Sequence, residues 1–170
     1  MGVSFYGCVS LDGYLADKNH SLEWLYQVGS IEETSYDQFY ASLDITIMGK
    51  RTFDEIAKME QPQQVYGQTE NYVLTHAKTL DIEGFIPIET DIVDFVRRLP
   101  QEKKVWIIGG NQLVNPLLEN NLIDQLILQI APVVLGEGIP LFTGTTLKNF
   151  KLIETKQYGP FAELVYQCKQ

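Results

Sequence analysis

The stretch Lys103-Lys-Val-Trp-Ile-Ile-Gly-Gly-Asn-Gln-Leu-Val114 contains the strongest fold signal in the chain. Its four apolar residues, 105–108, follow two lysines and predict a short strand buried on both faces, as in a parallel sheet. Gly109 and Gly110 end this strand, and a polar pair then leads into an apolar, helix-like run. Because glycine lets backbone N–H groups approach an anion closely, a strand, a Gly-Gly turn and a helix start are typical of a phosphate-binding cradle. A simple tight turn would use the same residues, so the pair alone leaves both interpretations open.

Pro116 interrupts the helix expected over residues 112–120. A proline inside a helix removes one backbone hydrogen bond and clashes with the preceding turn. One alternative is a kinked helix that begins directly after Gly110. The other is a regular helix that begins at Asn115 with Pro116 in its first position, which would move the helix start away from the glycines and weaken the phosphate interpretation.

The composition is that of an ordinary globular protein: of 170 residues, 45% are hydrophobic and 21% are charged. One domain spanning residues 1–170 is expected from this length. The net charge of −9 argues against a nucleic-acid partner or an anionic membrane surface. No apolar run approaches the roughly 20 residues of a membrane-spanning helix, and the N-terminus lacks the features of a signal peptide. We therefore expect a cytoplasmic protein.

Neither a disulfide framework nor a metal site is expected. The two cysteines, Cys8 and Cys168, lie in strand-like segments and are interpreted as buried thiols in a reducing compartment. With only His20 and His76 in addition, the chain has too few ligands for a cysteine or histidine metal site.

A second strand–glycine–helix junction follows the alternating segment Asp44-Ile-Thr-Ile-Met48. Gly49, Lys50 and Arg51 come next, and Thr52-Phe-Asp-Glu55 fits a capping box that would start a helix. Cations at a helix start oppose the helix dipole, whereas an anion bound between them and the helix would account for them. Two solvated surface cations are the alternative.

A third strand end carries polar and basic groups. The segment 71–75 is typical of a short strand, and His76-Ala-Lys78 follows it. Strands and helices alternate early and the chain ends in strands, which predicts an α/β fold with a mixed, mainly parallel sheet of about eight strands flanked by helices on both faces. Ligands of such sheets bind beyond the carboxyl ends of the strands. Three such ends with glycine or basic residues favour a dinucleotide phosphate ligand.

Two segments before residue 44 also bear on the site. The loop from Leu11 to Trp24 is rich in apolar residues and must cover either the core or a ligand, so it is a candidate lid. Ser30-Ile-Glu-Glu33 fits a capping box for a helix whose buried face carries the aromatic and apolar residues 36, 39, 40 and 43.

These motifs, in this order, resemble the dihydrofolate reductase superfamily over nearly the whole chain. SLDG and GEGIPLF are more similar to the riboflavin-pathway reductases (the RibD C-terminal branch), and IMGKRTF is more similar to dihydrofolate reductase itself. The resemblance implies a dihydrofolate reductase-like fold, NADPH as cofactor and hydride transfer as the reaction. It rests on SLDGYLA (10–16), Trp24, IMGKRTF (47–53), YVLT (72–75), IIGGNQLV (107–114) and ILQIAPVVLGEGIPLF (127–142).

The resemblance also implies which residues bind the cofactor. The second junction would hold the pyrophosphate and the adenosine end, and the third strand end would lie near the adenosine ribose phosphate. The Gly-Gly turn would contact the pyrophosphate from the other side, and the loop would cover the nicotinamide. The implied cofactor residues are Leu15, Ala16, Gly49, Lys50, Arg51, Thr52, Thr75, His76, Lys78, Gly109, Gly110, Asn111, Gln112 and Leu113.

The substrate side departs from both branches. Dihydrofolate reductase places a carboxylate early in the second helical region, where Glu32, Glu33 and Asp37 are the candidates here. We take Glu33 and Asp37 as candidate catalytic residues, although Glu32 and Glu33 are also ordinary first-turn acids. The His-x-Leu-Arg helix segment of the riboflavin branch is absent, and Tyr14 replaces its usual lysine.

The expected function is transfer of hydride from NADPH to a small heterocyclic or sugar-phosphate-like substrate. The aminopyrimidine reductase of riboflavin biosynthesis is the alternative enzyme, and a nucleotide-binding module without turnover is the alternative of another class. Besides a small-molecule substrate, a second copy of the chain is an expected partner, because exposed strands near the C-terminus favour a homodimer.

Overall fold

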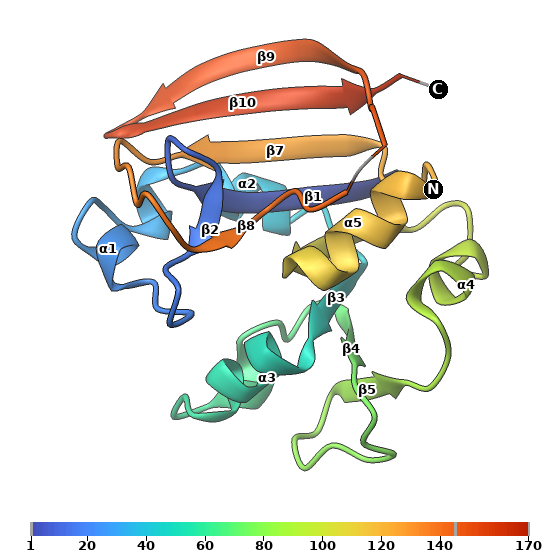
Figure 1. The fold of residues 1–170 in the computed structure, drawn as a ribbon. Helices are drawn as coiled ribbons and strands as arrows, with labels where there is room; N and C mark the ends of the chain where they lie inside the picture. The colour runs from blue at the N-terminus through green and yellow to red at the C-terminus, as the bar shows by residue number, and fades with distance from the viewer. Residues whose placement is uncertain (1, 145, 170) are drawn as a thin grey trace.

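An eight-stranded sheet forms the centre of the computed structural model, which describes residues 2–144 and 146–169 (Figure 1). The strands are β1 (Gly2–Val9), β2 (Tyr14–Ala16), β3 (Ile45–Gly49), β4 (Glu70–Leu74), β5 (Phe85–Ile88), β6 (Lys104–Gly109), β7 (Gln125–Ile130), β8 (Ile139–Pro140), β9 (Phe150–Tyr158) and β10 (Phe161–Cys168). The order in the large sheet is β5-β4-β3-β6-β1-β7-β10-β9. Its pairs are parallel from β5 to β7, whereas β10 is antiparallel to both β7 and β9. The short strands β2 and β8 form a separate antiparallel pair.

Helices cover both faces of this sheet. The α-helices are α1 (Glu23–Tyr26), α2 (Tyr36–Tyr40), α3 (Lys50–Ala57), α4 (Ile92–Arg97) and α5 (Asn111–Glu119), with 3-10 turns at Ile31–Glu33 and Pro62–Gln64. Buried residues of α4 and α5 share one apolar cluster with the central strands. On the opposite face, α2 packs over β1 and β6, and α3 packs over β3 and β4.

Alternation along β1 shows how the two faces are filled. Phe5 is fully buried in the cluster that contains Val96 of α4 and Leu117 of α5. Tyr6, the next residue, points to the other face, where its ring stacks on Phe39 of α2 and meets Trp106 of β6 edge-on. Because successive strand residues point to opposite faces, β1 is buried on both sides, as is usual for a central parallel strand.

The predicted fold class is confirmed, and so are several local predictions. The sheet is mixed and mainly parallel, with helices on both faces. Asp91 caps α4, because its carboxylate accepts hydrogen bonds from the backbone N–H groups of Val93 and Asp94. The strand that contains Pro87 lies at the edge of the sheet, where a missing N–H donor costs least.

The structure corrects two local predictions and decides between the two alternatives for α5. The predicted capping box at Thr52-Phe-Asp-Glu55 is wrong: β3 stays paired up to Gly49, and α3 begins at Lys50 with Gly49 as its N-cap. The single helix expected after Ser30 is broken into the 3-10 turn 31–33 and α2. Of the two alternatives for α5, the structure shows the first: the helix begins at Asn111, directly after Gly110, and has Pro116 inside it.

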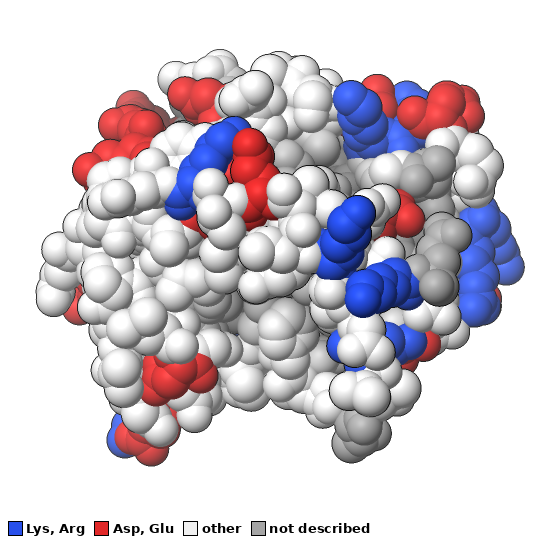
Figure 2. Space-filling view, turned by 90° about the horizontal axis from the view of Figure 1, so that it is seen from above, with Lys and Arg blue, Asp and Glu red and all other residues white. Residues whose placement is uncertain are grey.

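Surface features agree with a globular chain. None of the helices formed by residues 2–144 and 146–169 is long and apolar enough to cross a lipid bilayer. Figure 2 looks down on the side of the molecule where β9 lies, and there acidic and basic side chains occur in small groups among many uncharged ones.

Candidate active site

The three strand ends singled out in the sequence lie side by side. Strands β4, β3 and β6 are neighbours and parallel, and their register pairs Gly49 with Leu74 and Met48 with Gly109. All three therefore end at one edge of the sheet, within one residue of the same level. Thr75 follows the first of these strands, and Gly110 follows the third.

Two helices begin at this edge without a side-chain cap. Gly49 is the N-cap of α3 and Gly110 is the N-cap of α5, and neither helix has an acidic residue in its first turn. The N-terminus of α4, which also follows a strand, is capped by Asp91. The first N–H groups of a helix need an acceptor, and the helix dipole favours an anion there. The two uncapped N-termini on neighbouring strands are thus suited to one phosphate-bearing ligand.

The two glycine junctions approach each other closely. A Cβ atom added to Gly49 would lie 3.8 Å from the carbonyl oxygen of Gly109. Gly109 has a φ of +113°, a conformation that side chains rarely adopt, and its peptide bond to Gly110 is cis. A Cβ added to Gly110 would meet no heavy atom within 4 Å. The left-handed backbone is therefore at Gly109, and Gly110 borders open space.

The basic residues at this edge differ in what they contact. Lys50 forms an ion pair with Asp54 and lies over the ring of Phe53, with 5.4 Å from Nζ to the ring centroid. Arg51 and Lys78 are exposed and form no ion pair with any residue that the structure describes. Arg51 and Lys78 are therefore available to an anionic ligand, whereas Lys50 is partly neutralised.

The remaining cofactor candidates fall into two groups. Asn111 and Leu113 have structural roles: the Asn111 side chain donates to the Pro140 carbonyl (2.9 Å), and Leu113 is 1% exposed with its N–H bonded to the Gly110 carbonyl (3.0 Å). The others lie at or near the surface of the edge. Thr52 and Thr75 are half-buried, His76 and Gln112 are exposed, and Thr75 Oγ1 accepts a hydrogen bond from the Ala77 N–H.

The segment expected to be a lid is fastened to the turn before β8. Leu15 and Ala16 belong to β2, which pairs with β8, and Ala16 is buried. The carboxylate of Asp12 accepts hydrogen bonds from the N–H groups of Leu135 (3.1 Å) and Gly136 (2.8 Å) and from the hydroxyl of Ser10 (2.7 Å). Residues 10–16 are thus held to residues 135–140 by backbone pairing and by one carboxylate.

Asp12→Asn should lower stability in a pH-dependent way. The Ser10 hydroxyl and the two backbone N–H groups hold the pKa of Asp12 below its usual value. A depressed folded-state pKa means that the stabilisation is present above the unfolded value of about 3.9 and is lost as the pH falls through the folded value. We expect a lower melting temperature for Asp12→Asn than for wild type at neutral pH, with the difference closing in acid.

Thermal unfolding followed across that pH range measures the effect. Asp81→Asn is the matched control, because Asp81 is exposed and accepts no hydrogen bond from a described residue. A difference that is the same at neutral and acid pH would contradict the assignment of the effect to the Asp12 carboxylate.

The two candidate catalytic carboxylates both lie on the exposed surface. Glu33 accepts a hydrogen bond from the Ser30 N–H (2.8 Å), which confirms the capping box predicted at Ser30. Asp37 lies in the first turn of α2. Neither side chain is buried, so each has the environment of a helix-start acid.

A buried polar network beneath α2 was missed in the sequence. Glu163 of β10 is 3% exposed, and its Oε2 accepts hydrogen bonds from Ser35 Oγ and Gln129 Nε2. Gln129 Nε2 also donates to Tyr6 Oη (3.2 Å). Burial raises the pKa of Tyr6, and the nearby Glu163 adds to that effect.

A sequence signal for this network exists. Glu163 alternates with Phe161 and Val165, which share its face of β10 and are buried, so its position is an inward one. Gln129 follows Ile127 in the same way on β7. Charged or amide residues at inward positions of a strand are rarely buried without partners, so period-two alternation could have identified both.

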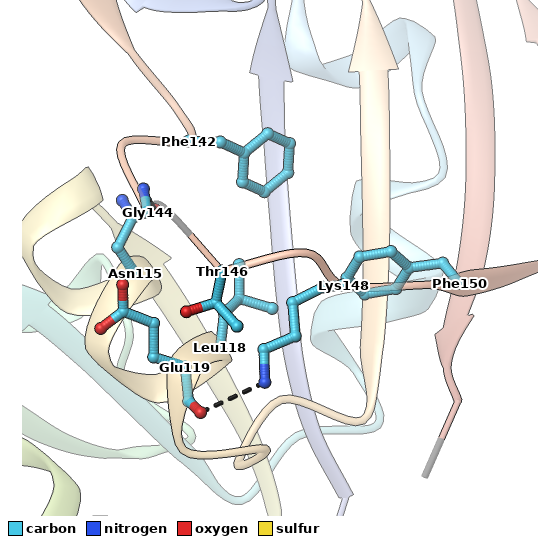
Figure 3. A pocket seen from close by; sticks show the side chains of 8 residues that line it. All are labelled: Asn115, Leu118, Glu119, Phe142, Gly144, Thr146, Lys148 and Phe150. Atoms are coloured by element: carbon cyan, nitrogen blue, oxygen red, sulfur yellow. Dashed lines mark hydrogen bonds between the residues drawn. The ribbon is translucent and has the colours of Figure 1, made fainter.

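Two cavities have no residue of the two glycine junctions in their linings. One, of about 220 Å³, lies between the end of α5 and residues 142–144 and 146–150 (Figure 3). There Lys148 Nζ donates to the Glu119 carbonyl (3.2 Å) and to Asn121 (2.8 Å), as expected for a cation that neutralises a helix C-terminus. The other, of about 250 Å³, lies between α2 and the β7–β10–β9 end of the sheet and includes Ser35 and Glu163 in its lining.

Residues 3–163 match the family model of the RibD C-terminal domain. The Bacillus subtilis (strain 168) protein YwjB, itself uncharacterized, is 36% identical over 165 residues, which cover 95% of this chain and 94% of the relative.

Two solved structures share the fold. A candidate riboflavin biosynthesis protein from Shewanella sp. PV-4 superposes with a TM-score of 0.84 at 24% identity, covering 100% of both chains. Dihydrofolate reductase from Enterococcus faecalis, in complex with NADP(H), superposes with a TM-score of 0.65 at 13% identity, covering 99% of this chain and 97% of that one. At these identities the two neighbours show that the chain has a dihydrofolate reductase-like fold.

Proposed function

This chain belongs to the RibD C-terminal domain family, and on that basis we propose that it is a reductase that transfers hydride from NADPH to a small heterocyclic substrate. The aminopyrimidine of riboflavin biosynthesis is the first substrate to test, because a structural neighbour is assigned to that pathway. A nucleotide-binding module without turnover is the candidate of another class.

One observation supports NADPH more than any other: two uncapped helix N-termini, at Gly49 and Gly110, lie on neighbouring strands. A pyrophosphate is a doubly charged acceptor that fits two sets of backbone N–H groups at once. The residues present therefore fit the cofactor. Gly49 and Gly110 would hold the pyrophosphate, and Arg51 and Lys78 would hold the ribose phosphate.

The chain's part in the reaction is mainly positioning. When bound, NADPH supplies the hydride. The β2 segment, held to β8, would exclude water from the bound ligand, and the glycine junctions would fix the orientation of that ligand. Correct orientation and exclusion of water account for much of the rate of such reactions.

A fluorescence titration with NADPH, followed by NADPH oxidation assays with a panel of aminopyrimidines, pterins and quinones, tests the proposal. We expect saturable NADPH binding and turnover with at least one member of the panel. Binding without turnover would favour the nucleotide-binding module, and absence of binding would overturn the proposal.

Arg51→Ala and Lys78→Ala should each reduce the preference for NADPH over NADH. These cofactors differ by one phosphate, and a charge-assisted hydrogen bond to it is worth roughly 1.5–3 kcal/mol before solvent screening. We expect wild type to prefer NADPH by about tenfold or more, and less so at high salt, because both cations are exposed.

The measurement is the pair of dissociation constants for each variant. Lys58→Ala is the control, since Lys58 is exposed at the far end of α3 and pairs with Glu55. If the substitutions weaken both cofactors alike, the cations serve the shared pyrophosphate instead of the ribose phosphate.

A further inference from the structure

Reduction of a C=N or C=O bond needs a proton as well as a hydride. The hydride forms the new C–H bond, the π electron pair moves to the heteroatom, and that heteroatom takes the proton. The exposed candidates Glu33 and Asp37 lie in ordinary helix-start environments. We propose that Glu163, through the Ser35 hydroxyl, is the residue that holds and delivers this proton, an inference that rests on the proposed reductase function.

The first argument is the position of Glu163 relative to the glycine edge, the edge of the sheet where Gly49 and Gly110 lie. The β1–β6 register, extended two residues beyond the pair of Phe5 with Ile107, puts Gly7 at the level of Gly109. Gln129 pairs with Cys8 on one side and with Glu163 on the other. Glu163 is therefore within one residue of the level of the Gly109–Gly110 turn, three strands away, which is about 14 Å at the usual strand spacing.

The second argument is that the hydrogen-bond network suits both protonation states of Glu163. As arranged, Ser35 Oγ and Gln129 Nε2 donate to the carboxylate, which satisfies the charged form. Gln129 is 1% exposed, and its Oε1 has no hydrogen-bond partner among the described residues. A rotated amide would turn this oxygen toward Glu163 to accept from the protonated acid, and a serine hydroxyl both donates and accepts.

The third argument is a route for proton exchange. Ser35 and Glu163 both line the cleft of about 250 Å³ between α2 and the β7–β10–β9 end of the sheet. Ser35 Oγ also lies 3.2 Å from Tyr6 Oη, which donates to Thr34 Oγ1 (3.1 Å). The hydroxyl groups of Ser35, Tyr6 and Thr34 thus form a chain that extends from Glu163 over β1. Solvent in the cleft returns the proton to Glu163 after each turnover.

Other charged and titratable groups around Glu163 come from β1 and β9. Strand β1 contributes Tyr6. Strand β9 contributes three residues that line the cleft, namely Glu154, Lys156 and Tyr158. Lys156 is opposite Glu163 in the sheet register but forms its ion pair with Glu154 (3.0 Å). Gln38 and Phe39 of α2 line the cleft together with Ser35, the N-cap of that helix, and no acid of α2 is part of the lining.

Glu163→Gln tests the proposal, with Glu154→Gln as the matched control in the same cleft. Loss of a general acid lowers kcat by about 100-fold or more, so we expect that loss for Glu163→Gln, with NADPH affinity unchanged and a flattened pH profile. Glu154→Gln should keep the wild-type rate and profile. Ser35→Ala should lower kcat in the same direction, which keeps the test available if Glu163→Gln does not fold.

An unchanged rate and an unchanged pH profile in Glu163→Gln would overturn the role of Glu163 alone. Wild type that binds NADPH but reduces no panel member would instead overturn the proposed function.

Discussion

Gly110→Ala should weaken NADPH binding by about 10- to 100-fold, or roughly 1.4–2.8 kcal/mol, without destabilising the fold. The reason lies in the difference between the two glycines. Gly110 has an ordinary φ of −83°, and a Cβ there meets no heavy atom within 4 Å. The added methyl is therefore harmless to the free protein, but it occupies the space from which a phosphate would approach the start of α5.

Parallel measurements of NADPH affinity and unfolding free energy separate the two effects. Gly2→Ala is the matched control: it also adds a methyl in open space, but at the start of β1, at the opposite edge of the sheet. If Gly110→Ala folds normally and binds NADPH as tightly as wild type, the cradle assignment is wrong.

Gly138→Ala should destabilise the protein by about 1–3 kcal/mol through overpacking. A Cβ at this position would lie 2.3 Å from the carbonyl oxygen of Ala16 and 3.2 Å from the ring of Tyr14. The nearest atom is backbone and cannot rotate away, so β2 and β8 would have to separate. Because the β2–β8 pairing holds this segment, we also expect faster hydrogen exchange in residues 11–16.

Urea unfolding and hydrogen exchange measure the two consequences. Gly67→Ala is the control, since its nearest neighbour, the Gln64 carbonyl oxygen, would be at an ordinary 3.5 Å. Wild-type stability together with wild-type exchange in Gly138→Ala would show that the β2–β8 contact is loose enough to absorb a methyl group.

The sequence by itself determined the fold class and the glycine edge. Four consecutive apolar residues before Gly109 predict a strand that is buried on both faces, and the alternating run before Gly49 predicts a second strand. Both patterns are short-range, so the sequence alone contains them. Parallel strands align their carboxyl ends, so the chain order alone brings the two junctions to one edge. The cap at Asp91 and the edge position of Pro87 were likewise local, because each depends on one residue's own hydrogen bonds.

Only the tertiary structure decided what depends on contacts across the chain. Whether α3 starts at Lys50 or after Thr52 depended on pairing with β4 and β6, since the strand hydrogen bonds continue to Gly49. The sequence also left open whether α5 starts at Asn111, with Pro116 inside the helix. The structure shows a contact from outside the helix that bears on this choice: the Asn115 side chain donates to the Asn111 carbonyl and to the carbonyl of Leu141, thirty residues beyond the start of the helix.

The buried carboxylate shows the same limit most clearly. Glu163 is separated from Ser35 by 128 residues and from Gln129 by 34, so alternation marks Glu163 as inward but does not identify its hydrogen-bond partners. Burying a carboxylate is unfavourable unless donors surround it, and those donors come from a helix start and a neighbouring strand. A local pattern carries no information about such distant donors, so the fold had to bring Glu163, Ser35 and Gln129 together before the network existed.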